Sequence, residues 1–138
     1  MVKIKKLNDT NKHTANKKTE CQNIMHMINS SMSISFEEKS FKMTGNQLGY
    51  TQSLLINLKK CLIFSPSIIG YGDIFLSPKH SRELGLARAS SVYLKMLETD
   101  PSIGEVNILG ETPKNIFKME HNQQFGKKIP GIKVRFSK

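Results

Sequence analysis

The segment from Ser77 to Gly110 constrains the fold of this chain more than any other stretch. Ser77 is a good helix N-cap, and Pro78 suits the first helical position because proline has no backbone N–H to leave unpaired there. Apolar and small residues then recur at steps of three and four, which predicts a helix to about Leu97 with one buried face. The residues of this predicted face are Leu84, Ala87, Ser91, Leu94 and Leu97.

Strand and helix signals continue after this helix. Asp100-Pro101 and Gly104 end the helix and turn the chain. Residues 105–109 alternate in the manner of a strand, with Val106 and Ile108 on one face. Thr112-Pro113 repeats the cap-plus-proline pattern and predicts a second, short helix.

The last apolar stretch, residues 129–136, predicts a closing strand. Ile132, Val134 and Phe136 would share one face of it, and Lys133 and Arg135 the other. Helix, strand, helix and strand in this order predict an α/β domain with a mixed sheet over residues 34–138.

The stretch before Ser77 is read as β-structure. Ile34 and Phe36 alternate with serines, and Phe41 and Met43 alternate with Lys42. Residues 54–58 and 61–64 then form two short apolar runs around Lys59-Lys60. Two strands joined by a tight turn are the favoured interpretation, since breakers follow at Ser65-Pro66. A single helix from Thr51 to Phe64 is the alternative, because the leucines also fit helical spacing. Residues 70–76 would form a loop.

Residues 1–33 form a basic, polar N-terminal extension without Gly or Pro. Lysines dominate from Lys3 to Lys18, which predicts an arm that stays extended or disordered until it meets a partner. Four apolar residues near its end would form a short amphipathic turn, either packed on a neighbouring protein or part of a flexible tail. They are Ile24, Met25, Met27 and Ile28.

The charge of the chain predicts an anionic partner. Its 138 residues carry a net charge of +10, with 21 basic and 11 acidic residues. Only three of the basic residues are arginines, so phosphate contacts by flexible lysines are favoured over the reading of bases.

The cysteines and histidines give no sign of a cofactor. Cys21 and Cys61 make neither a disulfide framework nor a paired metal motif, so a reducing compartment is the default and Cys61 is read as a small buried hydrophobe. The four histidines have no second ligand pair at metal-binding spacing. No apolar run approaches the roughly 20 residues of a membrane span, and no signal peptide is expected.

The element order resembles that of the small-subunit ribosomal protein S-eleven family over about residues 50–136. Gly70-Tyr71-Gly72 leading to Ser77-Pro78 is similar to that family's glycine loop and Thr-Pro helix start. Residues 104–110 resemble its Glu-Val strand, and residues 131–136 the strand before its tail. The first loop lacks the family's basic residues, the second puts Lys114 near the family's arginine, and the basic proline-rich tail is absent.

The resemblance implies a ribonuclease-H-like mixed sheet with one long and one short helix, in a divergent mitochondrial ribosomal protein. It implies binding to small-subunit ribosomal RNA at the platform, together with neighbouring ribosomal proteins, and no cofactor, membrane or small-molecule substrate. Catalysis is not expected, because the candidate first strand lacks the carboxylates that hold metal ions in such nucleases. The expected RNA-binding residues are Gly70, Tyr71, Gly72, Lys79, Gly110, Lys114, Lys127, Lys128, Lys133 and Arg135.

Two alternatives remain open. The large-subunit L-eighteen family has a similar order of helix, strand, loop and helix. The other alternative is an accessory subunit of an organellar complex, in which the charge only keeps the protein in solution. The location is expected to be the mitochondrial matrix, with plastid or cytoplasm as alternatives.

Overall fold

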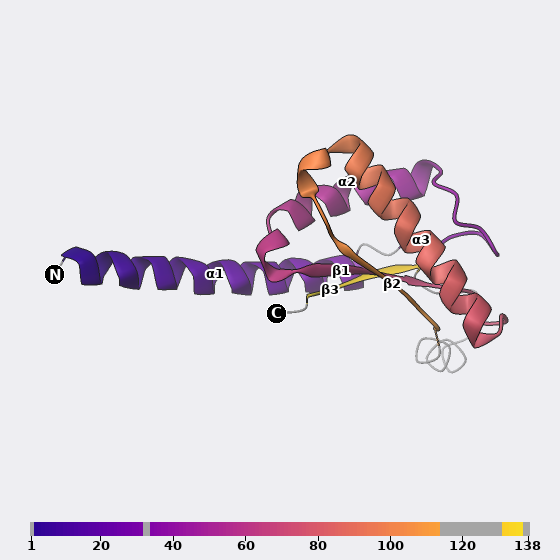
Figure 1. Ribbon diagram of the computed structural model, residues 1–138, viewed down its shortest axis with the longest axis horizontal. Helices are drawn as coiled ribbons and strands as arrows, with labels where there is room; N and C mark the ends of the chain where they lie inside the picture. Colours follow the sequence, from indigo (N-terminus) through magenta and orange to yellow (C-terminus); the bar gives the residue numbers. More distant parts are fainter. Residues whose placement is uncertain (1, 32–33, 114–130, 137–138) are drawn as a thin grey trace.

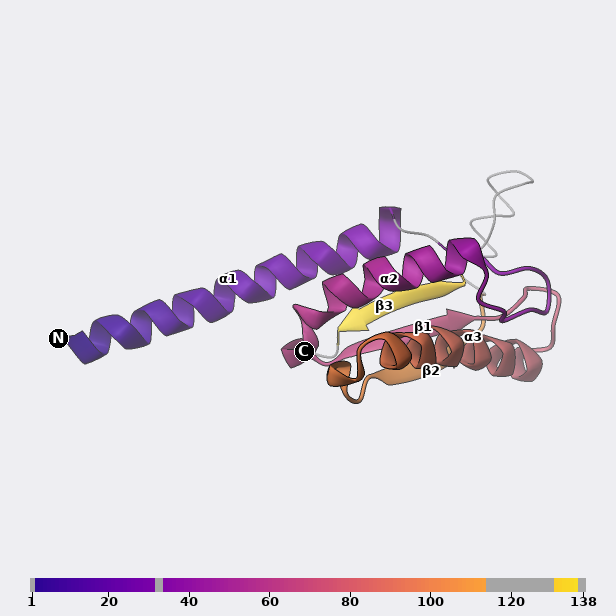
Figure 2. The same cartoon turned by 90° about the horizontal axis from the view of Figure 1, so that it is seen from above.

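The computed structural model describes residues 2–31, 34–113 and 131–136, with side chains of the first helix described from Asn16 to Ser30. Three α-helices and a three-stranded mixed sheet make up this part of the chain. In Figures 1 and 2, α2 and α3 cover one face of the sheet, and α1 lies at its edge and extends beyond it. The elements are α1 Val2–Ser31, α2 Gly45–Lys59, β1 Pro66–Tyr71, α3 Pro78–Thr99, β2 Asn107–Glu111 and β3 Ile132–Phe136.

The predicted long helix is confirmed as α3. The Ser77 side chain accepts a hydrogen bond from the backbone N–H of His80 at 3.3 Å, and Pro78 occupies the first turn. The helix ends at Thr99, and the carboxylate of the next residue, Asp100, caps the short turn Pro101–Ile103 that follows.

The residues predicted for the buried face of α3 are wrong, because none of the five is buried. The period is correct, but Leu94 is 62% exposed. Small residues face the sheet instead, because Gly85 packs directly on the backbone of Gly70, where no side chain would fit. The buried residues of α3 are Ser81, Gly85, Arg88, Ala89, Val92 and Met96.

The sheet has the order β2-β1-β3. β1 and β2 are parallel, with Ile68 opposite Ile108, and α3 forms the connection between them. β3 is antiparallel to β1, with Ile68 opposite Val134. The predicted strands at 105–109 and 129–136 are confirmed with shifted bounds, and so is the mixed α/β class.

The strands predicted before β1 are wrong. Residues 54–58 belong to α2, and Leu62–Phe64 form a 3₁₀ turn. The helical alternative was the correct type, since Leu54 and Leu58 are four residues apart and both are fully buried. Gly45 and Gly49, although glycine is typical of turns, lie inside this helix, whose N-cap is Thr44.

Residues 34–43, also predicted as strands, contain no strand. Their alternation reflects partial burial of a loop: Ile34 joins the core, and Phe36 packs against it. The Ile34 carbonyl accepts a hydrogen bond from the Gly131 N–H at 2.7 Å, which fixes the loop next to β3.

A single main core fills the space between the sheet and the two helices. Leu54 and Leu58 of α2, Val92 and Met96 of α3, and Ile68 of β1 are buried there without exposed surface. Burial of a side chain of this size contributes about 1.5–3 kcal/mol to folding. The core therefore depends on α2 as much as on α3.

The basic arm, predicted as extended or disordered, is helical. α1 begins at Val2 and runs to Ser31. Its last turns pack on the domain itself and not on a neighbouring protein, because Ile28 is buried in the main core and Ile24 contacts it. Figures 1 and 2 show the N-terminal part of α1 projecting away from the rest of the molecule.

Asn29 fastens the end of α1 to the edge of the sheet. Its side-chain amide donates to the Val134 carbonyl oxygen at 2.8 Å, and its side-chain oxygen accepts from the Val134 N–H at 2.9 Å. The side chain therefore replaces the two hydrogen bonds that a further strand would make with β3 at this position.

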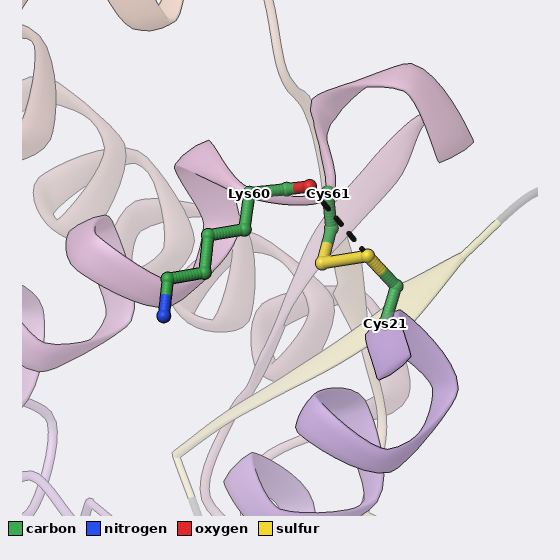
Figure 3. Close-up of a disulfide and its surroundings, with 3 residues drawn as sticks. All are labelled: Cys21, Lys60 and Cys61. Carbon is green, nitrogen blue, oxygen red and sulfur yellow. Dashed lines mark hydrogen bonds between the residues drawn. A yellow bond between two sulfur atoms is a disulfide. The ribbon is translucent and has the colours of Figure 1, made fainter. Parts of the chain in front are cut away.

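A disulfide bond joins α1 to the segment after α2. Figure 3 shows Cys21 bonded to Cys61, and their Cα atoms are 5.7 Å apart. The Cys21 sulfur lies 3.6 Å from the Lys60 carbonyl oxygen, and Phe64 and Phe136 pack nearby. The expectation of unpaired cysteines is wrong, because the fold brings together residues 40 positions apart. The cysteines consequently give no support to a reducing compartment.

Candidate nucleic-acid interface

The glycines predicted to contact RNA lie between the sheet and α3. A Cβ at Gly70 would overlap the carbonyl oxygen of Gly85, and one at Gly72 would overlap that of Ser81. Gly110 of β2 has the same relation to the backbone of the helix. These glycines allow a close approach of strand and helix, so the loop predicted at Gly70 is the end of β1.

Tyr71 is only 8% exposed. Burial raises the pKa of its hydroxyl, Glu111 raises the pKa further, and Arg135 lowers it. The two charged residues, on the neighbouring strands β2 and β3, thus shift the pKa of the Tyr71 hydroxyl in opposite directions. Tyr71 was expected to bind RNA, and stacking of its ring on a base would require it to leave this site.

Arg88 is the centre of a buried polar network that the sequence analysis missed. It comes from the sheet-facing side of α3 and its side chain is 4% exposed. A charged residue between Ala87 and Ala89, within a helix face of small residues, was the available signal. The guanidinium donates to the carbonyl oxygens of Tyr71 at 2.8 Å, Ser40 at 2.8 Å and Glu37 at 3.1 Å, and to the Asp73 carboxylate at 3.0 Å.

Asp73 follows β1, and both of its carboxylate oxygens are engaged. Oδ1 accepts from Arg88, and Oδ2 accepts from the Lys39 backbone N–H at 2.7 Å. Hydrogen bonds to charged groups are stronger than neutral ones. The pair therefore fixes the loop around Lys39 against the ends of β1 and α3.

Lys79 is exposed in the first turn of α3. The positive end of the helix dipole is located there, and the first turn contains no acidic residue. Arg82 is exposed one turn further along. These two cations lie at the N-terminus of α3, together with the exposed carboxylate of Glu83.

Lys133 and Arg135 point away from α3, as predicted for the outward face of β3. Arg135 makes an exposed ion pair with Glu111, with 3.5 Å between Nη1 and Oε1. An exposed pair of this kind contributes at most about 1 kcal/mol, so it can exchange for a phosphate. Lys114, Lys127 and Lys128 lie outside the described residues.

The sequence of α1 supplies a further set of cations. Six lysines and two carboxylates occur between Val2 and Glu20, and Lys17 and Lys18 are exposed. Among the residues that the structure describes, no helix is long and apolar enough to cross a membrane. Within the same residues, no cluster of three His, Cys, Asp or Glu side chains could hold a metal ion.

Neither the protein-family models nor the curated proteins include a match to this chain.

Proposed function

We propose that the protein binds RNA as a divergent member of the S-eleven family, in the small subunit of a mitochondrial ribosome. The distribution of charge carries the proposal. The chain has a net charge of +10, and α1 extends about 28 Å beyond Cys21 with six lysines in its sequence. A projecting basic helix suits a groove lined by phosphates.

Part of the fold supports the proposed ribonuclease-H-like relationship. The parallel pair β1–β2, connected by α3 and flanked by the antiparallel β3, gives the mixed sheet that this relationship requires. One difference shortens the part of the chain that resembles the family. The helix α2 occupies the position of a hairpin in the family's order of elements. The resemblance to the family therefore depends on the residues from Gly70 onward.

Catalysis is not part of the proposal. Asp73, the carboxylate nearest the end of the central strand, is already bound by Arg88 and by a backbone N–H. Among the described residues, no cluster of three His, Cys, Asp or Glu side chains could hold a metal ion with it. The role we propose is structural, with ribosomal RNA and neighbouring ribosomal proteins as partners.

The test is the affinity for a fragment of small-subunit ribosomal RNA as a function of salt concentration. Each phosphate contact contributes about 0.7–0.9 to the slope of log affinity against log salt. Lys17→Ala/Lys18→Ala should therefore lower the slope by about 1.4–1.8. Lys95→Ala is the matched control, because Lys95 is paired with Glu98 on α3. Equal slopes for the double variant and the wild type would remove α1 from the interface.

Sedimentation distinguishes the remaining candidates. Association with the small ribosomal subunit in a sucrose gradient of mitochondrial extract is the expected result. Sedimentation with the large subunit would favour the L-eighteen relationship. Migration with a complex that contains no RNA would identify an accessory subunit and overturn the proposal.

A further inference from the structure

The two edges of the sheet differ in how they are protected. Beyond β3 lies α1, whose Asn29 makes two hydrogen bonds with Val134. The other edge is β2, and in Figure 2 none of the described helices or strands lies beyond it. Natural proteins protect an open edge with lysine, proline, a bulge or a covering element. β2 contains neither lysine nor proline, and it keeps a regular register with β1 from Asn107 to Glu111. The edge is therefore suited to pairing with another strand.

The outward backbone groups of β2 belong to Ile108 and Gly110. The Gly72 N–H donates to the Glu111 carbonyl oxygen at 3.4 Å, so the backbone groups of Glu111 are directed toward β1. This direction alternates along a strand, and Leu109 is therefore also directed toward β1. Ile108 and Gly110 have their N–H and C=O groups directed away from β1, where a further strand would bind them.

These outward groups are self-complementary about Leu109. When two β2 strands lie antiparallel with the two Leu109 residues directly opposite, Ile108 of each copy lies opposite Gly110 of the other. The residues of each such pair exchange both of their hydrogen bonds. The same register places Glu111 opposite Asn107, so no carboxylate lies opposite its own copy. No basic residue occurs in β2, so the positive charge of the chain does not oppose the contact there.

The side chain of Leu109 lies on the face of the sheet opposite α3, because its neighbour Gly110 faces that helix. Leu109 is 43% exposed, and it lies opposite Ile69 of β1, which lies opposite Lys133 of β3. Pairing about Leu109 would bring the leucines and isoleucines of both copies into one continuous apolar row. The two Lys133 residues would lie at the opposite ends of this row, far from each other. The open face of the sheet thus has the pattern that a two-fold axis at Leu109 requires.

The position of α3 fits the same axis. The helix packs over Gly70 of β1 and Gly110 of β2, so its own axis lies between these two strands. Because adjacent strands are about 4.8 Å apart, the α3 helices of two paired copies would lie about 10 Å apart. This is the distance at which helices pack against each other. Leu86 is 43% exposed and lies above Gly110, on the side of α3 that would face the second copy.

We propose that two copies of the chain pair through β2 and form a symmetric dimer. The pairing joins the two three-stranded sheets into one and places the two α3 helices side by side on one face. The occupant of the edge is a second copy and not a strand of another protein, because the backbone groups, the apolar row and the helix spacing all fit one two-fold axis. The proposal concerns the protein free in solution and does not rest on the proposed function.

The first experiment is sedimentation equilibrium of the oxidised full chain at about 0.15 M salt, from micromolar to near-millimolar protein. The mass should rise with concentration toward twice the 15.6 kDa of one chain. Leu109→Lys places two like charges opposite each other at the axis, and should raise the dissociation constant of the dimer more than about tenfold. Leu94→Lys is the matched control, since it makes the same change at a residue of α3 that is 62% exposed, and should leave the dissociation constant unchanged.

Amide hydrogen exchange, measured by NMR over the same concentrations, locates the contact. The N–H groups of Ile108 and Gly110 should become protected as the dimer forms, whereas that of Leu109, already directed toward β1, should change little. Unchanged exchange of Ile108 and Gly110 in a dimer, or a dimer that Leu109→Lys leaves intact, would place the contact elsewhere and overturn the proposal. A mass of one chain at every concentration would overturn it as well. So would a covalent dimer on a non-reducing gel, because the association would then result from exchange of the Cys21–Cys61 disulfide bond.

Discussion

Reduction of the disulfide bond should lower the stability of the protein substantially. The bond closes a loop between residues 40 positions apart, Cys21 and Cys61. The chain entropy that such a cross-link removes from the unfolded state corresponds to about 4 kcal/mol at 25 °C. Since small domains have a total stability of about 5–15 kcal/mol, this is a large share.

Urea unfolding followed by circular dichroism measures the effect. With a urea slope of about 1–3 kcal/mol per molar for a small protein, the midpoint should fall by at least about 1 M when dithiothreitol is added. The double variant Cys21→Ala/Cys61→Ala should unfold near the midpoint of the reduced wild type. It should not respond to dithiothreitol, which makes it the control for other effects of the reductant.

Either of two results would refute this reasoning. If mass spectrometry shows two free thiols in the untreated protein, the bond is absent. If the bond is present but its reduction leaves the urea midpoint unchanged, the cross-link does not lower the entropy of the unfolded chain. The loop-entropy estimate would then not apply.

Three further predictions concern single contacts. Arg88→Met should cost about 3–5 kcal/mol in urea unfolding, because it leaves a buried carboxylate and three carbonyl oxygens without their donor; a loss below about 1 kcal/mol would contradict the network. Gly85→Ala should destabilise the protein by about 1–3 kcal/mol, because the new Cβ collides with the sheet. Gly49→Ala in α2, where a Cβ has open space, should stabilise it by about 0.5–1 kcal/mol. Equal effects of the two variants would show that helix propensity alone decides the change in stability. The pKa of Asp100 is lowered to about 2, first by its hydrogen bond with Lys59, so its contribution is complete above the ordinary pKa of 3.8 and is lost as the pH falls toward 2. Lys59→Met should flatten the urea midpoint between pH 4 and 2, and an unchanged profile would exclude the pair as a cause.

The elements predicted correctly from the sequence are those with local signals. The serine cap and the proline at the first position define the start of α3, and the alternation of Ile132, Lys133 and Val134 defines β3. The helix α2 was mistaken for a hairpin because Lys59-Lys60 between two apolar runs also fits a turn. Only tertiary burial of Leu54 and Leu58 on one helix face distinguishes the two cases.

The candidate site was less predictable, because its glycines and its arginine act over long sequence distances. Gly70 reads as a loop residue until Gly85 is placed against it. Arg88 acquires its partners from residues up to 51 positions away. The disulfide bond likewise joins two residues far apart in the sequence, Cys21 and Cys61. Exposed cations such as Lys79 and Arg135 are correctly placed on the surface, since charged side chains are rarely buried without partners.

The hydrogen bonds of Asn29 to Val134 limit how copies of this chain can associate through their sheets. With β3 blocked at its centre, β2 is the edge that remains open among the described strands. A chain with one open edge can pair with a second copy, and that pairing then consumes the only free edge of both. Edge-to-edge growth through the described strands therefore ends at two molecules, because α1 stays at the edge of β3 through the buried Ile28 and the Cys21–Cys61 disulfide as well as through Asn29.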